Sequence, residues 1–123
     1  MEEDLVEKKT AKLARQAGFS EKCYWYLCPQ GRFRNKTELD WNSINVPYEH
    51  SSLPTQSLLQ KWLREVHGIE VIPSPSFKRK SYGCEVYHYT EKNETGYVPI
   101  ELGSFKTYEE ALEEGVQEAL KLI

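Results

Sequence analysis

The sequence has little of what marks secreted, membrane-spanning or disulfide-stapled proteins. Its 123 residues include three cysteines, and an odd count argues against a disulfide framework. No stretch approaches the roughly 20 consecutive apolar residues that span a bilayer. The N-terminus is acidic, whereas a secretory signal begins with basic residues. We therefore expect a cytoplasmic protein that makes no membrane contact and forms a single domain over residues 1–123.

An excess of positive charge is also missing. The chain has 16 Lys and Arg residues against 19 Asp and Glu residues, which gives a net charge of −3. A general binder of the nucleic-acid backbone is usually strongly basic, because its affinity comes from Lys and Arg on phosphates. The charge balance therefore disfavours direct nucleic-acid binding without excluding it.

No group of residues forms a catalytic or metal-binding motif. Cys23 and Cys28 are five positions apart on a strand-like run, whereas zinc ligands are usually roughly two to four apart on a turn. Cys84 and His88 share a strand face but are about 13 Å apart along it, too far for a catalytic pair. We therefore expect no metal, no cofactor and no catalytic residue, and hence no enzyme.

The last helix, by contrast, is rich in carboxylates. Such a cluster is typical of the solvated face of an amphipathic helix. Acidic side chains in a first turn also complement the helix dipole. We interpret the following residues in this way: Glu109, Glu110, Glu113, Glu114 and Glu118.

Residues 54–123 predict one structural unit in αβββα order. Two apolar stripes at helical spacing predict helices over 55–67 and 107–122, and a small sheet would bury both stripes. Gly115 within the second helix indicates a close approach by a neighbouring element, and Pro99 indicates an edge strand or a bulge at that position. The predicted strands cover 69–72, 84–90 and 97–102. The fold class is thus α+β, a small antiparallel sheet of three to five strands with helices on one face.

Residues 1–53 are harder to interpret. A helix is predicted over 2–17, with Glu2, Glu3 and Asp4 at its positive end. The run 23–28 is aromatic and strand-like, and residues 32–34 are its expected partner. Residues 35–53 show little periodicity, so they form either a surface excursion or an undetected edge strand near 38–44.

Two groups of side chains are candidates for binding. Exposed tyrosines suit protein contacts, because they combine apolar area with a polar tip. The alternative, which we favour slightly, is that the N-terminal segment with Trp25 and Trp41 covers the tyrosine face. The candidate protein interface comprises Tyr24, Tyr26, Tyr87 and Tyr89. The candidate nucleic-acid contact is the basic cluster Lys78, Arg79 and Lys80.

The order helix, three strands, helix resembles the double-stranded RNA-binding domain in topology. That family places lysines at the start of its last helix, where they contact phosphates. Here Glu109 and Glu110 occupy this region and would repel phosphate. The resemblance therefore keeps nucleic-acid binding as the alternative function and weakens it at the same time.

A more specific resemblance covers about half of the chain. It is carried by Thr10-Ala-Lys-Leu-Ala, Gly18-Phe19, Pro54-Thr-Gln-Ser-Leu-Leu-Gln-Lys-Trp-Leu-Arg-Glu-Val-His-Gly68 and residues 105–123. These segments closely resemble small uncharacterised proteins encoded by phages and integrated elements of gut Bacteroidales. That group has no established activity, so the resemblance implies a genomic setting and transfers no site residue. The leading hypothesis is a non-catalytic protein-interaction module with an unknown protein partner, present as a monomer or a homodimer.

Overall fold

The protein has an α+β fold with two separate antiparallel sheets. A computed structural model describes residues 4–43, 50–76, 80–89 and 97–123. Each sheet has three strands, in the orders β2-β1-β3 and β4-β5-β6. The elements are α1 (Lys8–Gln16), β1 (Cys23–Cys28), β2 (Gly31–Leu39), β3 (Ser51–Ser52), α2 (Gln56–His67), β4 (Ile69–Ser76), β5 (Ser81–Tyr89), β6 (Tyr97–Phe105) and α3 (Tyr108–Leu120).

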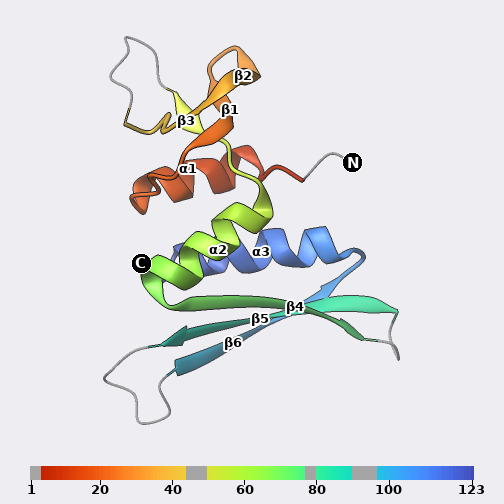
Figure 1. The fold of residues 1–123 in the computed structure, drawn as a ribbon. Coiled ribbons are helices and arrows are strands. Elements are labelled where there is room, and N and C mark those ends of the chain that lie inside the picture. Colours follow the sequence, from red (N-terminus) through yellow and green to blue (C-terminus); the bar gives the residue numbers. More distant parts are fainter. Residues whose placement is uncertain (1–3, 44–49, 77–79, 90–96) are drawn as a thin grey trace.

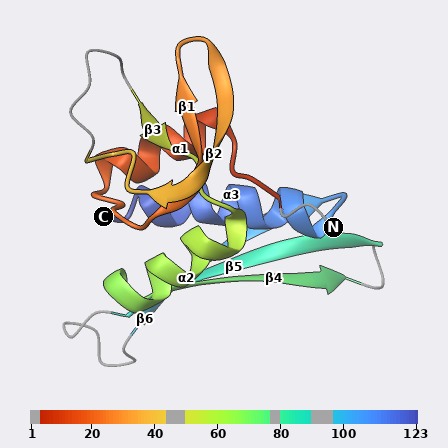
Figure 2. The same cartoon turned by 45° about the horizontal axis from the view of Figure 1, so that its top comes forward.

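The helices lie between the two sheets (Figures 1 and 2). α3 packs along all three strands of the C-terminal sheet, and α2 packs against α3 and β4. α1 contacts α3 on one side and β3 on the other. The N-terminal sheet β2-β1-β3 is therefore joined to the rest of the molecule through the helices. No helix in the described part of the chain is long and apolar enough to cross a membrane.

The predicted αβββα unit is confirmed, and its helices Gln56–His67 and Tyr108–Leu120 lie within the predicted ranges 55–67 and 107–122. The side chain of Thr55 caps α2 by accepting a hydrogen bond from the backbone N–H of Leu58 at 3.2 Å. Gly68 ends this helix in the left-handed conformation, with φ of 66°. Thr107 caps α3 in the same way and accepts from the N–H of Glu110 at 3.1 Å. These ends were predictable because each depends on residues within one helical turn.

The close approach predicted at Gly115 is also confirmed. A Cβ added at this glycine would overlap the sulfur of Cys84 and stand 2.7 Å from Cγ1 of Val71. Val71, Cys84 and Val86 form the buried face of the C-terminal sheet against α3. A residue without a side chain at position 115 lets the helix lie directly on the strands.

The prediction that the first strand of this unit ends near Ile72 is wrong. β4 continues to Ser76, with Pro73 opposite Cys84 and Pro75 opposite Tyr82. β4 is an edge strand, and the two prolines, two positions apart, direct their nitrogens to the same side. That side is the open edge, where no ladder hydrogen bond is lost. β6 forms the other edge, as Pro99 indicated.

The first helix begins later than predicted, at Lys8 instead of near position 2. Residues 4–6 are extended and pair with the start of α2: the N–H of Val6 donates to the carbonyl of Pro54 at 3.0 Å. The N–H of Gln56 donates to the carbonyl of Asp4 at 2.9 Å. Of the three acidic residues predicted at the start of this helix, Glu2 and Glu3 lie outside the described residues. Asp4 is described and lies before the helix begins.

Glu113 of α3 places a buried carboxylate at the start of α1. This residue was expected on the solvated face, but it is only 4% exposed. Its carboxylate accepts from the N–H of Glu7 at 3.0 Å, from the hydroxyl of Thr10, and from the amide of Gln56 at 2.9 Å. A buried carboxylate with these three donors complements the positive end of α1. The prediction was wrong because the partners lie more than 50 positions away in the sequence.

The N-terminal strands are longer than the sequence indicated. β2 covers Gly31–Leu39 instead of 32–34, with a register shift where it pairs with the start of β1. No residue of β2 is fully buried, so the strand lacks the apolar alternation that would reveal it.

Candidate binding cleft

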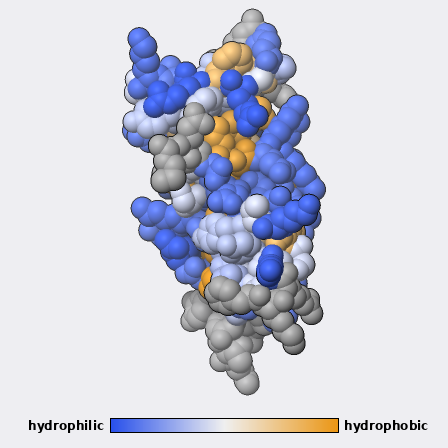
Figure 3. Space-filling model, turned by 90° about the vertical axis from the view of Figure 1, so that its right-hand side faces the viewer, coloured by the Kyte–Doolittle hydropathy of each residue, from blue (hydrophilic) through white to orange (hydrophobic). Residues whose placement is uncertain are grey.

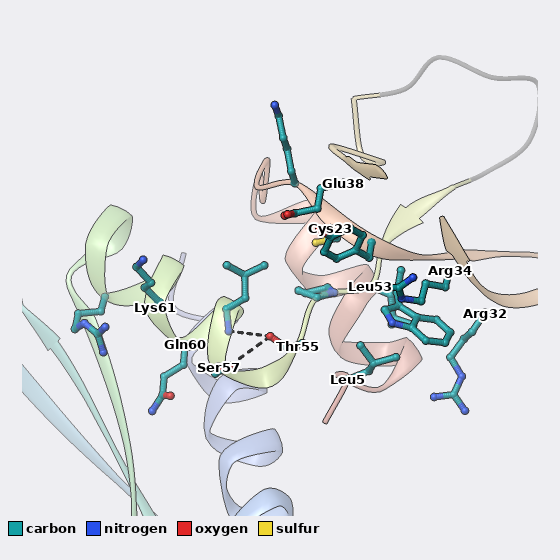
Figure 4. A pocket seen from close by; sticks show the side chains of 16 residues that line it. Leu5, Cys23, Arg32, Arg34, Glu38, Leu53, Thr55, Ser57, Gln60 and Lys61 are labelled. Atoms are coloured by element: carbon teal, nitrogen blue, oxygen red, sulfur yellow. Dashed lines mark hydrogen bonds between the residues drawn. The ribbon is translucent and has the colours of Figure 1, made fainter. Parts of the chain in front are cut away.

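A cleft of about 1300 Å³ lies between the N-terminal sheet and α2 (Figure 4). Small-molecule sites usually measure about 300–1,000 Å³, so this cleft is larger than such sites. Leu5, Leu53 and Leu58 supply apolar lining. Figure 3 shows a hydrophobic area ringed by hydrophilic side chains, at the level where the N-terminal sheet meets the start of α2. The cleft is therefore apolar at its base and polar at its walls.

Strand β2 forms one wall through two arginines. Arg32 and Arg34 are two positions apart, so they share one face of the strand. Arg32 pairs with Leu27, and Arg34 pairs with Trp25. Residues directly opposite in an antiparallel pair share a face, and Leu27 is buried, so this face is the inner one. β2 is an edge strand, which leaves both arginines exposed beside the cleft.

Helix α2 forms the opposite wall. Its lining residues follow helical spacing, so they form one stripe on the helix surface. They are Ser57, Leu58, Gln60, Lys61 and Arg64. The amide of Gln60 donates to the carbonyl of Val71 at 2.7 Å, while Lys61 and Arg64 are exposed. Figure 4 shows Lys61 on one side of the cleft and Arg32 and Arg34 on the other.

The cleft has a strong positive balance. Five cationic side chains and one acidic side chain, Glu38, line it; the cations are Lys22, Arg32, Arg34, Lys61 and Arg64. Arg64 forms a 3.9 Å ion pair with Glu70, but both side chains are about half exposed, where such pairs contribute little. Among the residues that the structure describes, Lys22, Arg32 and Lys61 form no ion pair. Most of this positive charge is therefore not neutralised.

Two aromatic rings lie among these cations. Tyr24 is 41% exposed, and the guanidinium of Arg34 lies over its ring, 4.9 Å from the centroid. Trp25 also lines the cleft and is half buried. Arg34 and Tyr24 form a cation–π pair, which holds the arginine without neutralising its charge.

The thiol that lines the cleft is a poor nucleophile. Cys23 lines the cleft, but burial raises the pKa of its thiol to about 12, so the reactive thiolate is scarce at neutral pH. None of the lining residues is a histidine. Among the described residues, no group of three His, Cys, Asp or Glu side chains gathers to hold a metal ion. The chemistry that the cleft supports best is the binding of an anion.

The tyrosines predicted as one interface lie in different places. Tyr24 lines the cleft. Tyr26 belongs to an aromatic cluster, with its ring 4.0 Å from that of Trp41, 5.8 Å from that of Phe33 and 5.3 Å from that of His50, centroid to centroid. The indole N–H of Trp41 donates to the carbonyl of Cys23 at 2.8 Å. Tyr26 therefore packs within the N-terminal sheet.

Tyr87 lies on the other sheet, on the face that points away from the helices. It is half buried, and its hydroxyl donates to the carboxylate of Glu85. Tyr89 is in the same strand, but its side chain lies outside the described residues. The N-terminal sheet lies on the helix side of the C-terminal sheet (Figure 1). Our expectation that the segment with Trp25 and Trp41 covers the tyrosine face is therefore wrong.

Lys80, the member of the predicted basic cluster that the structure describes, does not line the cleft. Lys80 is exposed at the start of β5 and has a positive φ of 52°, whereas Lys78 and Arg79 lie outside the described residues. Sequence reasoning missed the cleft because its cations come from three separate segments. The available signals were the two-residue spacing of Arg32 and Arg34 and the three-residue spacing of Lys61 and Arg64.

Comparison with known proteins adds no relative. No family model matches the chain, no curated protein matches it, and no solved structure matches it. The α+β fold and the cleft therefore carry the functional argument.

Proposed function

We propose that this protein is a non-catalytic binding module, and that its cleft binds an extended anionic partner. The proposal rests on five cationic side chains that line one cleft, with a single acidic side chain among them. Arg32 and Lys61 lie on opposite walls. An anion between them interacts favourably with both walls and relieves the repulsion between like charges.

The negative overall charge is compatible with this proposal because the charges are segregated. Glu70, Glu85 and Glu101 lie on the outer face of the C-terminal sheet. Glu70 pairs with Tyr87 on this face, and Glu85 pairs with Glu101. A basic cleft in an otherwise acidic protein attracts anions locally, because a concave surface focuses the field of its lining charges. The charge count of the whole chain therefore understated anion binding. A cytoplasmic setting, within a phage or mobile element, is part of the same proposal.

A polyanion column tests the cleft. The double variant Arg32→Gln/Lys61→Gln should elute from immobilised heparin at clearly lower salt than the unmodified protein. The matched control, Lys8→Gln/Lys12→Gln, removes the same charge from exposed positions on α1 and should elute close to the unmodified protein. Equal shifts for both variants would show that heparin responds to overall charge alone, and the proposal would fail.

A second candidate function uses the outer face of β4-β5-β6. Ile72 on this face is 43% exposed, Tyr87 lies beside it, and no described element packs there. We propose that a host or phage protein contacts this face if the module has a protein partner. This site would be supported by a protein that is enriched by the unmodified chain and by Tyr24→Ser but is lost with Tyr87→Ser. Retention by Tyr87→Ser would remove it.

A further inference from the structure

We propose that the anionic partner of the cleft is a single-stranded nucleic acid. This inference rests on the proposed function and names its ligand. Arg32 on β2 and Lys61 on α2 would contact phosphates from opposite walls, and Trp25 would stack on a base. Cations and aromatic rings lie together in one cleft, and neither feature alone would indicate a single strand.

The aromatic residues separate a nucleic acid from other polyanions. Trp25 and Tyr24 line the cleft among the cations, and single-strand binders combine a basic groove with rings on which bases stack. A nucleic acid presents a phosphate and a flat base at every step. An acidic peptide supplies the charges but offers no regular flat groups to the rings. The apolar lining from Leu5 and Leu58 also suits the faces of bases better than carboxylates.

The geometry favours a single strand over a duplex. Double-stranded RNA is recognised across a broad basic surface by shape and backbone contacts, whereas here the cations face each other across a cleft. In the αβββα unit, the start of α3 presents Glu109 and Glu110, both exposed, where a duplex binder of this topology carries lysines. Bases reach Trp25 only if they are unpaired. The duplex is therefore the disfavoured form.

Arg34 has a distinct role in this arrangement. Its guanidinium lies over the ring of Tyr24 at 4.9 Å, which fixes a flat cation at the cleft wall, where Arg34 is opposite Trp25 of β1. Guanidinium planes stack on unpaired bases in RNA recognition. Arg34 therefore positions Tyr24 and adds charge, while Arg32 and Lys61, which form no ion pair among the described residues, remain available to phosphates.

Fluorescence anisotropy of a labelled oligonucleotide of about twelve thymidines provides the test, since this length covers a typical single-strand site. We expect binding that weakens with salt between about 50 and 200 mM. Arg32→Gln/Lys61→Gln should weaken it by about tenfold or more, and Lys8→Gln/Lys12→Gln should leave it within about twofold. An acidic peptide of the same length and a duplex of the same sequence are the comparison ligands.

Tryptophan fluorescence reports stacking independently of stability. The oligonucleotide should quench the emission of the unmodified protein, because a base lies on Trp25. Trp25→Phe keeps an aromatic ring for packing and should lose most of this quenching while still binding the oligonucleotide. Quenching unchanged in Trp25→Phe would overturn the stacking arrangement, whatever the affinity.

The outcomes separate the inference from the proposal on which it rests. Cleft-dependent binding of the single strand that exceeds binding of the peptide and the duplex supports the inference. Cleft-dependent binding of the peptide or the duplex in preference to the single strand overturns the inference and leaves the anion-binding cleft intact. Binding of none of the three ligands overturns both.

Discussion

The two sheets of this protein are stabilised in different ways. The C-terminal sheet packs one face against α2 and α3, where Ile69, Val71 and Val86 are almost completely buried. The N-terminal sheet has no buried residue in β2, and it depends on the aromatic cluster around Tyr26 and Trp41. Periodic apolar burial thus holds one sheet, whereas ring contacts and side-chain hydrogen bonds to the backbone hold the other.

The junction between the two units is partly polar. Thr10 of α1, Gln56 of α2, and Glu113 and Gln117 of α3 are all buried and hydrogen-bonded to one another. Beside them, the ring of Phe19 contacts that of Trp62 edge to face, with centroids 5.2 Å apart. A buried polar group stabilises only while its partners remain in place, so the junction specifies how the N-terminal unit sits on the C-terminal unit.

The largest predicted effect comes from the junction. Glu113→Ala leaves the N–H of Glu7, the hydroxyl of Thr10 and the amide of Gln56 without their acceptor, which should lower the free energy of unfolding by about 3 kcal/mol. Urea unfolding measures this change. Glu114→Ala, at the exposed neighbouring position, serves as the control and should differ by less than about 0.5 kcal/mol. Equal effects of the two variants would contradict the buried network.

The second prediction concerns the contact between α3 and the C-terminal sheet. Gly115→Ala places a methyl group against Cys84 and Val71 and should destabilise the protein by about 2 kcal/mol through overpacking. Without that contact, alanine would stabilise a helix by about 1 kcal/mol relative to glycine, so the sign of the change is decisive. Gly103→Ala in β6, where an added Cβ meets nothing within 4 Å, should have little effect on the thermal midpoint.

The third prediction concerns the aromatic cluster of the N-terminal sheet. Tyr26→Ala removes ring contacts with Trp41 and Phe33 and should cost about 1–2 kcal/mol. Tyr24→Ala, in the same strand but exposed, should cost less than half as much. Chemical denaturation of both variants gives the comparison. A larger loss of stability in Tyr24→Ala than in Tyr26→Ala would show that this sheet is stabilised by contacts on the cleft side instead of by the aromatic cluster.

The same division between the two regions explains what the sequence predicted. The αβββα unit was predictable because the caps at Thr55 and Thr107 and the stop at Gly68 are local signals, and because its apolar stripes face one sheet. β2 escaped prediction because an exposed edge strand lacks alternation. Glu113 escaped because no local pattern distinguishes a carboxylate that caps another helix from one in solvent.

The cleft was unpredictable for a related reason. Each of its walls reads as an ordinary exposed surface, since charged residues on an edge strand or a helix are usually solvated. Only the pairing of β1 with β2, and the packing of the N-terminal sheet beside α2, brings Arg32 and Lys61 to one site. The predicted tyrosines do not share one sheet, because Tyr24 and Tyr26 belong to the N-terminal sheet and Tyr87 to the other.

The smallest effect that still compares the two sheets concerns their buried thiols. Burial raises the pKa of Cys23 to about 12 and that of Cys84 to about 11, from an ordinary value of 9.0. The folded state therefore binds more protons than the unfolded state above pH 9, so stability falls as pH rises from there toward the folded pKa values. Below pH 9 this contribution is fully present. In Cys23→Ala/Cys84→Ala, which lacks both buried thiols, stability should fall less steeply over the same range. Parallel curves for the double variant and the unmodified protein would show that the thiols ionise equally well in both states.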